Sequence, residues 1–405
     1  MTHTLITFLG RTPKEAGGGY RTTCYDFGDG GDCEPLAFFG WALQRRLRPE
    51  RLVILGTAGS MWDHLFEGDF DLGDTALEER DALIDKVREQ EVAETDLKPL
   101  EPLLAEQLGC EVRLRLIPYC RDEIEQVELL RLLADNVASG DRVALDVTHG
   151  FRHLPMLALL SALHLQKVRG ATISHIYYGA LDRSRDGRTP VYELAGLLDI
   201  ADWLEALSVY GRTGDYGVFD RLLGEEIGGL LRQAAFFETV NRIGQARSLL
   251  RQVIKRLEER SGDPVLALFH DELERRISWA RQDNYYLRQR QLAREYLERG
   301  RYLEAILTGW EAFTTLLQRE SGGKLDPDNM AHREEVRQRF EEQQRAISPR
   351  TERFRAYDSL RRLRNAVAHG SQPKGEEVQR ALSSPEAMRD FLTDLFGRLL
   401  PEEAA

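Results

Sequence analysis

The sequence lacks the features that would place the chain in a membrane or export it. Its 405 residues contain no apolar run near the roughly 18 residues that a membrane-spanning helix needs. The start, Met1-Thr2-His3-Thr4, has neither the basic residues nor the cleavage site of a signal peptide. We therefore expect a cytoplasmic protein with no membrane partner.

Cysteine is also scarce. The four cysteines, Cys24, Cys33, Cys110 and Cys120, are widely spaced, form no Cys-x-x-Cys pair and have no histidines at zinc-binding spacing. We expect reduced thiols and no metal site. A dinucleotide cofactor is disfavoured as well, because no Gly-x-Gly-x-x-Gly follows the first expected strand. The sequence therefore predicts no cofactor.

Positive charge is in deficit over the whole chain. The net charge of -12 argues against a protein that coats nucleic acid non-specifically, since that activity needs a broad basic face. One stretch departs from this balance. The segment from Arg345 to His369 contains seven arginines and only two acidic residues, Glu352 and Asp358, so it carries a net charge of about +5. A local nucleic-acid site is one explanation, and a solvated helix face is the other.

Short apolar runs alternate with helical patterns over the first 200 residues. The length and the 42% hydrophobic content allow two or three domains with packed cores. Strands are expected at 5–9, 52–55, 112–117, 143–147 and 173–178, and helices at 35–46, 75–94, 99–108, 122–138 and 152–168. This alternation predicts an α/β Rossmann-like domain with a parallel sheet at residues 1–200. Strand signals then vanish, which predicts a helical connecting region at 201–297 and an all-helical bundle at 298–405.

Three of the expected strands end in loops that suit a ligand. The loops are Gly10-Arg11-Thr12, Gly56-Thr57-Ala58-Gly59-Ser60 and Thr148-His149-Gly150-Phe151-Arg152. In an open parallel sheet, ligands bind beyond the carboxyl ends of the strands, where glycine-rich turns present N–H groups to anions. A phosphate-bearing ligand is therefore expected there.

A second pattern lies near the C-terminus, where Arg364, Asn365 and His369 occur on a helix-like segment. Five residues turn about 500° on an α-helix, and we expect the guanidinium and the imidazole to share a face with Asn365 beside them. Histidine can exchange protons with a ribose hydroxyl and a leaving oxygen, and arginine can stabilise charge on a phosphate. The structural alternative is a plain helix end, with His369 at the negative pole of the helix dipole and Gly370 as its cap.

Together the two patterns resemble a known family. The segment from Asp146 to Arg152 resembles the ligand loop of CARF (CRISPR-associated Rossmann fold) domains, and Arg364-Asn365-x-x-x-His369 resembles the active-site motif of HEPN ribonucleases. In this order, with helices between them, they are similar to the CARF/HEPN effector ribonucleases of type III CRISPR systems. The resemblance spans essentially the whole chain.

This resemblance implies a ligand, a reaction and an assembly. A cyclic oligoadenylate would be the activator, bound by Thr148, His149, Gly150 and Arg152 with the loops at 10–12 and 56–60. Single-stranded RNA, not DNA, would be cleaved without metal by Arg364, Asn365 and His369, leaving 2′,3′-cyclic phosphate ends. The family's nuclease sites draw on both subunits, so a homodimer is implied, and two-fold symmetry suits a ring ligand of even size.

Two rival interpretations remain open from the sequence. One keeps the ligand domain but makes the helical bundle inert, so that the protein is a nucleotide-sensing adaptor. The other is a HEPN nuclease whose N-terminal domain binds an unrelated nucleotide or a partner protein.

Overall fold

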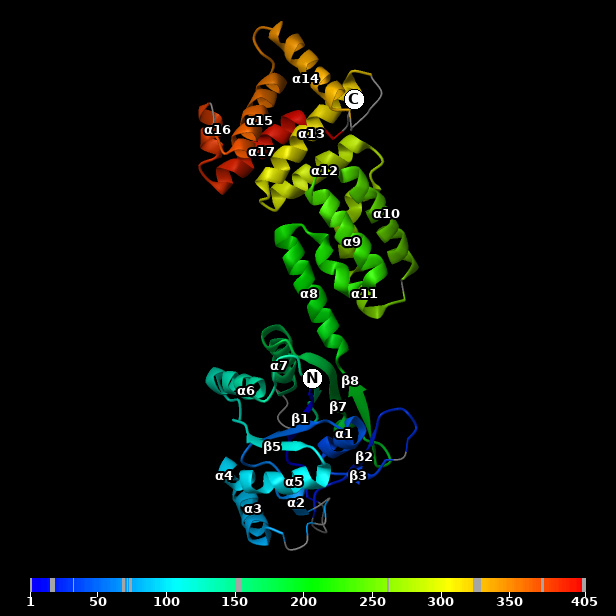
Figure 1. Cartoon of the computed structure of the whole chain (residues 1–405), viewed down its shortest axis with the longest axis vertical. Helices are drawn as coiled ribbons and strands as arrows, with labels where there is room; N and C mark the ends of the chain where they lie inside the picture. Colours follow the sequence, from blue (N-terminus) through cyan, green and yellow to red (C-terminus); the bar gives the residue numbers. More distant parts are fainter. Residues whose placement is uncertain are drawn as a thin grey trace. The chain divides into compact units, whose positions relative to one another are not determined.

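The computed structural model describes residues 2–14, 19–31, 33–67, 70, 72, 75–149, 154–260, 262–322, 329–372 and 375–402. The chain divides into two compact units, Met1–Leu198 and Asp199–Ala405 (Figure 1). The division at 200 and 297 that the sequence predicts stays a prediction, although residues 199–405 cluster here as one unit.

A mostly parallel sheet forms the centre of the N-terminal unit. Its strand order is β3-β2-β8-β7-β6-β1-β4-β5, and its pairs are parallel except for β2 with β3 and β7 with β8. The strands are β1 (His3–Leu9), β2 (Thr23–Asp26), β3 (Pro35–Leu36), β4 (Arg51–Gly56), β5 (Glu111–Leu116), β6 (Arg142–Asp146), β7 (Thr172–Gly179) and β8 (Arg188–Glu193). The five predicted strands are confirmed, and β2, β3 and β8 are additional.

Helices cover both faces of this sheet (Figure 1). They are α1 (Phe39–Leu47), α2 (His64–Glu67), α3 (Leu77–Glu89), α4 (Glu94–Leu97), α5 (Glu101–Leu108), α6 (Glu123–Asp135) and α7 (Leu154–His164). Successive residues of a strand point to opposite faces. Leu5 and Ile54 therefore join one core with α1 to α5, while Ile6 and Val53 join the other with α6 and α7. Strands buried on both faces explain the continuous apolar runs in the sequence.

Two expectations for residues 24–47 are wrong. The helix expected over 35–46 begins only at Phe39, because Pro35 and Leu36 pair with β2. The same hairpin sets Cys24 opposite Pro35 and brings Cys24 to within 5.5 Å of Cys33, measured between Cα atoms. These two residues form a disulfide, whereas Cys110 and Cys120 are free thiols. The pairing follows from the hairpin, which the sequence pattern did not reveal.

The C-terminal unit is helical throughout its described residues. Its helices are α8 (Gly196–Thr213), α9 (Gly224–Thr239), α10 (Ile243–Glu259), α11 (Pro264–Ile277), α12 (Tyr285–Glu298), α13 (Tyr302–Glu320), α14 (Met330–Arg345), α15 (Glu352–His369), α16 (Glu376–Ala381) and α17 (Pro385–Leu399). They share one hydrophobic core that includes Trp203, Leu292 and Leu363. In the described part of the chain, no helix is both long enough and apolar enough to cross a membrane.

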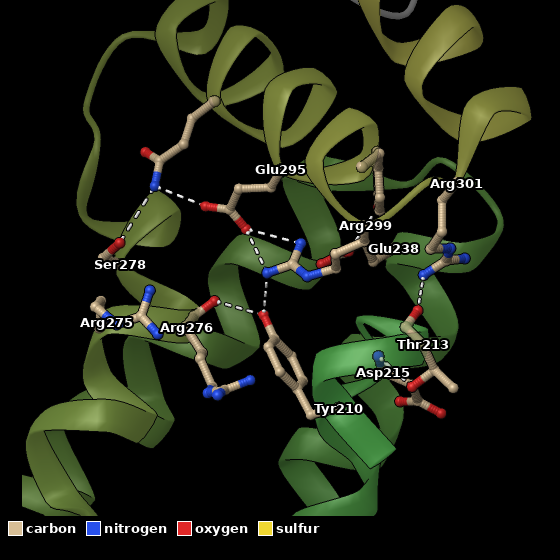
Figure 2. Close-up of polar contacts among 12 residues, drawn as sticks. Tyr210, Thr213, Asp215, Glu238, Arg275, Arg276, Ser278, Glu295, Arg299 and Arg301 are labelled. Carbon is tan, nitrogen blue, oxygen red and sulfur yellow. Dashed lines mark hydrogen bonds and ion pairs between the residues drawn. The ribbon is translucent and has the colours of Figure 1, made fainter. Parts of the chain in front are cut away.

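Polar contacts hold the C-terminal end of α8 against α12 and α13 (Figure 2). The hydroxyl of Tyr210 accepts a hydrogen bond of 2.9 Å from Arg299 Nη2, and Arg299 pairs with Glu295 at 3.2 Å. One turn further along, Arg301 Nη1 donates to the carbonyl of Thr213 at 2.5 Å. Side chains from α12 and the start of α13 therefore satisfy groups at the end of α8.

Candidate functional site

A cavity of about 470 Å³ opens at the carboxyl ends of β1, β4 and β6. These strands are neighbours in the sheet, so their terminal loops meet. The lining includes these predicted residues: Gly10, Arg11 and Thr12 after β1, Thr57, Gly59 and Ser60 after β4, and Thr148 and His149 after β6. The structure thus brings together three loops that are far apart in the sequence.

Two of the predicted ligand residues that the structure describes do not line this cavity. They are Gly56, the last residue of β4, and Ala58 in the loop that follows. Gly56 is needed for packing, because a Cβ there would lie 2.7 Å from the ring of Trp62. Gly150 and Arg152 fall outside the described residues, and their part in the site stays a prediction.

The turn after β4 uses its own side chains to shape the cavity wall. Ser60 Oγ donates to the carbonyl of Leu9 at 2.6 Å and accepts from the N–H of Thr57 at 2.9 Å. The indole of Trp62 donates to the carbonyl of Thr57 at 2.9 Å. The Ser60 hydroxyl is therefore committed to joining the ends of β1 and β4, and a ligand would meet the backbone that it positions.

Asp146 and Thr148 build the corresponding wall at the end of β6. The buried carboxylate of Asp146 accepts from the hydroxyl of Thr7 at 2.5 Å and from the N–H of Thr148 at 2.8 Å. Burial raises the pKa of Asp146 to about 6, and the hydrogen bonds from Thr7 and Thr148 oppose that rise. The hydroxyl of Thr148 in turn accepts from the N–H of Gly179 at 2.7 Å. These contacts fix the loop that carries the predicted ligand residues.

His149 is buried, with 5% of its surface exposed. Its Nε2 accepts from the N–H of Phe39 at 3.2 Å and lies 3.2 Å from the hydroxyl of Tyr25. Burial lowers the pKa of His149 to about 4, with a smaller contribution from His64. The ring is therefore neutral at physiological pH, and its Nε2 is occupied by the protein itself.

The sequence reasoning did not name seven of the lining residues, and three of these, Gln90, Tyr119 and Leu181, lie far in the sequence from the predicted loops. Gln90 follows α3, Tyr119 follows β5 and Leu181 follows β7. None lies in a glycine-rich loop or a motif, so no local signal distinguished them. Tyr119 supplies an aromatic ring, while Arg11 is the one cation among the described lining residues. An aromatic ring, hydroxyls, amides and one guanidinium suit a nucleotide-like ligand.

The second predicted site lies at the C-terminal end of α15. An aromatic cluster holds this helix against α13 and α14, with Tyr357 5.3 Å from both Trp310 and Phe340 between ring centroids. Thr351 caps its start by accepting from the N–H of Phe354 at 3.1 Å. Gly370 ends it with φ 59°, a left-handed conformation that favours glycine.

The candidate catalytic residues differ in exposure and direction. Asn365 and His369 are exposed, whereas Arg364 is half-buried and its Nη1 donates to Asn365 Oδ1 at 3.0 Å. Because α15 is helical through His369, five residues separate Arg364 and His369 by about 140° beyond a full turn. The expectation that the two side chains share a face is therefore wrong for a single chain. Among the described residues, Arg364 Nε is also buried without a hydrogen-bond partner.

No group of three or more histidine, cysteine, aspartate or glutamate side chains comes together as a metal site within the described residues. The predicted absence of a metal stays a prediction.

Comparison with known proteins finds a similarity for most of the N-terminal unit. Residues 4–182 match the family model for the CARF domain of the CRISPR system endoribonuclease Csx1. The chain is also 25% identical over 261 residues to the CRISPR-associated protein MJ1674 of Methanocaldococcus jannaschii. That alignment covers 60% of this chain and 41% of the relative, so the chain spans less than half of the relative's length. On these two findings, residues 4–182 are similar to the CARF domain of Csx1, and the chain is similar to a CRISPR-associated protein.

Proposed function

We propose that this protein is an antiviral endoribonuclease of a CRISPR system, activated by a cyclic oligoadenylate and cleaving single-stranded RNA without metal. The observation that carries the proposal is the cavity at the ends of β1, β4 and β6, which lies within the segment that matches a CARF domain. A ligand-sensing domain needs an effector, and Arg364, Asn365 and His369 in the helical unit are our candidates.

The size and chemistry of the cavity support a shared ring ligand. A volume of about 470 Å³ accommodates a drug-sized fragment, so a ring of several adenylates would extend beyond one chain. A two-fold homodimer would place two such cavities around one ring of even size. The backbone at 10–12 and 57–60 would face phosphates, with Arg11 as a cationic partner and Tyr119 as a surface for a base.

The proposed cleavage follows from the chemistry of imidazole and guanidinium. A neutral His369 takes the proton of the ribose 2′-hydroxyl, whose oxygen attacks the adjacent phosphorus and forms a 2′,3′-cyclic phosphate. The P–O5′ bond breaks, and the 5′-oxygen leaves with a proton from a second imidazole. Arg364 stabilises the charge that builds on the phosphate. Since the two side chains of one helix point about 140° apart, we infer that the partner subunit's copy completes the site.

Cleavage of a fluorescent single-stranded RNA in EDTA, with and without each cyclic oligoadenylate, tests the reaction. We expect stimulated cleavage that ends in 2′,3′-cyclic phosphates, and about a hundredfold or greater loss for Arg364→Ala and for His369→Ala. His270→Ala, in the same unit but outside the motif, is the matched control and should leave the rate unchanged. Full activity of His369→Ala would exclude this site.

Thermal unfolding with the same rings tests the ligand separately. A true ligand at about 100 times its Kd stabilises the unit that binds it by about 2.7 kcal/mol and so raises its Tm. A ring that raises Tm without stimulating cleavage would favour the adaptor interpretation. Cleavage that no ring stimulates, with no shift in Tm, would favour a nuclease whose N-terminal domain senses something else.

A further inference from the structure

Ion pairs within the protein neutralise only part of the arginine-rich segment from Arg345 to His369. The paired guanidiniums are those of Arg345 with Glu341, Arg353 with Glu320, Arg361 with Glu341 and Asp358, and Arg362 with Asp358. Arg350 and Arg355 form no ion pair with any described residue, and both are exposed. The sequence pattern alone gave all seven arginines equal weight.

These two arginines line a groove of about 580 Å³ between α15, α16 and α17. Arg380 of α16 also lines it, and no ion pair involves this side chain among the described residues. Two of the four carboxylates in the lining are already occupied, Asp358 by arginines of α15 and Asp394 by Arg398. Among the described residues, the groove therefore offers three guanidiniums without an ion pair, one of them stacked over Phe354, against two carboxylates without an ion pair, Glu377 and Asp390.

The groove runs along the side of α15 that leads to the candidate nuclease site. Arg355, Arg362 and His369 are seven residues apart, and seven residues turn about 700°, only about 20° short of two turns. The three side chains therefore leave α15 on one side. At about 1.5 Å per residue, Arg355 and His369 are about 21 Å apart along the helix.

We propose that this groove binds the single-stranded RNA substrate on its way to His369, with phosphates contacting Arg350, Arg355 and Arg380. The proposal rests on the proposed function, because it extends the same site. Positive grooves that track a backbone, with an aromatic ring for base stacking, are typical of proteins that bind single strands. The half-buried ring of Phe391 lines this groove and supplies such a surface.

These two carboxylates favour RNA over an acidic peptide as the occupant. Glu377 and Asp390 are exposed and can accept hydrogen bonds from the exocyclic amino groups of bases. An acidic peptide would instead bring further carboxylates into contact with them. The small positive balance of the groove also agrees with a chain of net charge -12, which would repel nucleic acid elsewhere.

RNA binding and RNA cleavage together test the groove. On a His369→Ala background, which keeps RNA intact, fluorescence anisotropy with a labelled 20-nucleotide strand should show about a tenfold higher Kd for Arg355→Ala and for Arg380→Ala. The slope of log Kd against log salt should fall by about 0.7 for each guanidinium removed. Arg339→Ala is the matched control, because its exposed guanidinium pairs with Glu335 on α14 outside the groove.

Cleavage kinetics separate binding from a structural effect. With His369 intact, Arg355→Ala should raise KM for the long strand and leave kcat unchanged. Cleavage of a dinucleotide should not change, since a dinucleotide cannot span the distance from His369 to Arg355. Equal Kd values for Arg355→Ala, Arg380→Ala and Arg339→Ala would contradict RNA binding in the groove. A competition experiment in which an acidic peptide displaces the labelled RNA and unlabelled RNA does not would contradict it as well. If the wild-type protein cleaved no RNA but the groove variants bound RNA more weakly, the proposed nuclease activity would be wrong and the proposed RNA binding in the groove would be supported.

Discussion

The imidazole of His149 is kept neutral by its surroundings. A protonated ring could not accept the hydrogen bond that the N–H of Phe39 donates to Nε2, and burial penalises the charge further. The folded state therefore binds a proton at this position only near pH 4, whereas an unfolded histidine binds one near pH 6.5. Stability that depends on the neutral ring is present above pH 6.5 and is lost as the pH falls towards 4.

This difference predicts how a variant responds to acid. Compared with His149→Gln, the wild-type N-terminal unit should lose about 2 kcal/mol of stability between pH 7.5 and pH 5, because glutamine has no proton to bind. Hydrogen exchange of the β6 amides at both pH values measures this loss of stability. Asp146 titrates in both proteins, so its contribution cancels in the comparison. A similar pH response in the two proteins would mean that His149 is not held neutral.

At the scale of elements, the site depends on how strand ends are tied together. The turn at 57–60 joins β4 to β1 through one hydroxyl, and the loop after β6 joins β7 through another. Both Ser60 and Thr148 were predicted to be among the residues around the ligand. The structure assigns them a positioning role, because Ser60 holds the carbonyl of Leu9 and Thr148 accepts from Gly179.

Ser60→Ala tests this positioning role. Removal of the buried hydroxyl leaves the carbonyl of Leu9 and the N–H of Thr57 without partners, so the N-terminal unit should lose about 2 kcal/mol of stability. Thermal unfolding should show the loss, and titration with the activating ring should show weaker binding. Ser321→Ala removes a hydroxyl bound to the carbonyl of Gln318 at an exposed helix end and should change stability by less than about 0.5 kcal/mol. Equal effects of the two substitutions would contradict the role given to Ser60.

At the scale of the whole molecule, the proposed sites are incomplete in one chain. A single cavity is small for a ring of several adenylates, and Arg364 and His369 point in different directions around α15. In a two-fold dimer, a second cavity would enlarge the ligand site and a second copy of α15 would complete the nuclease site. The chain mass is 46.3 kDa, so sedimentation should give about twice that value.

Mixed dimers give a sharper test of the shared nuclease site. A mixed dimer of the Arg364→Ala and His369→Ala proteins keeps one Arg364 and one His369, on different chains. It should cleave RNA faster than either variant alone but well below the wild-type rate, because the second imidazole that protonates the 5′-oxygen is absent. The specific activity of wild-type protein should also fall on dilution below the Kd of the dimer. Activity that does not change with dilution in a monomeric protein would contradict a shared site.

Local sequence patterns were sufficient to predict the central strands and the loops that end them. Parallel strands that are buried on both faces consist mostly of apolar residues. The strands at 5–9, 52–55 and 143–147 could therefore be predicted from local runs of apolar residues. Ligand loops follow such strands directly, which is why Gly10, Thr57 and Thr148 could be named in advance.

Only the tertiary structure decided what those loops and helices do together. The hairpin that pairs Cys24 with Pro35 overrode a helical pattern. Gln90 and Tyr119 reached the cavity, and Arg380 reached the groove, from elements distant in the chain. Periodicity reports which face of an element is buried, but not which other element covers it. Only the structure shows which arginines of the groove lack an ion pair with a described residue, because ion pairs depend on contacts between residues that are distant in the sequence.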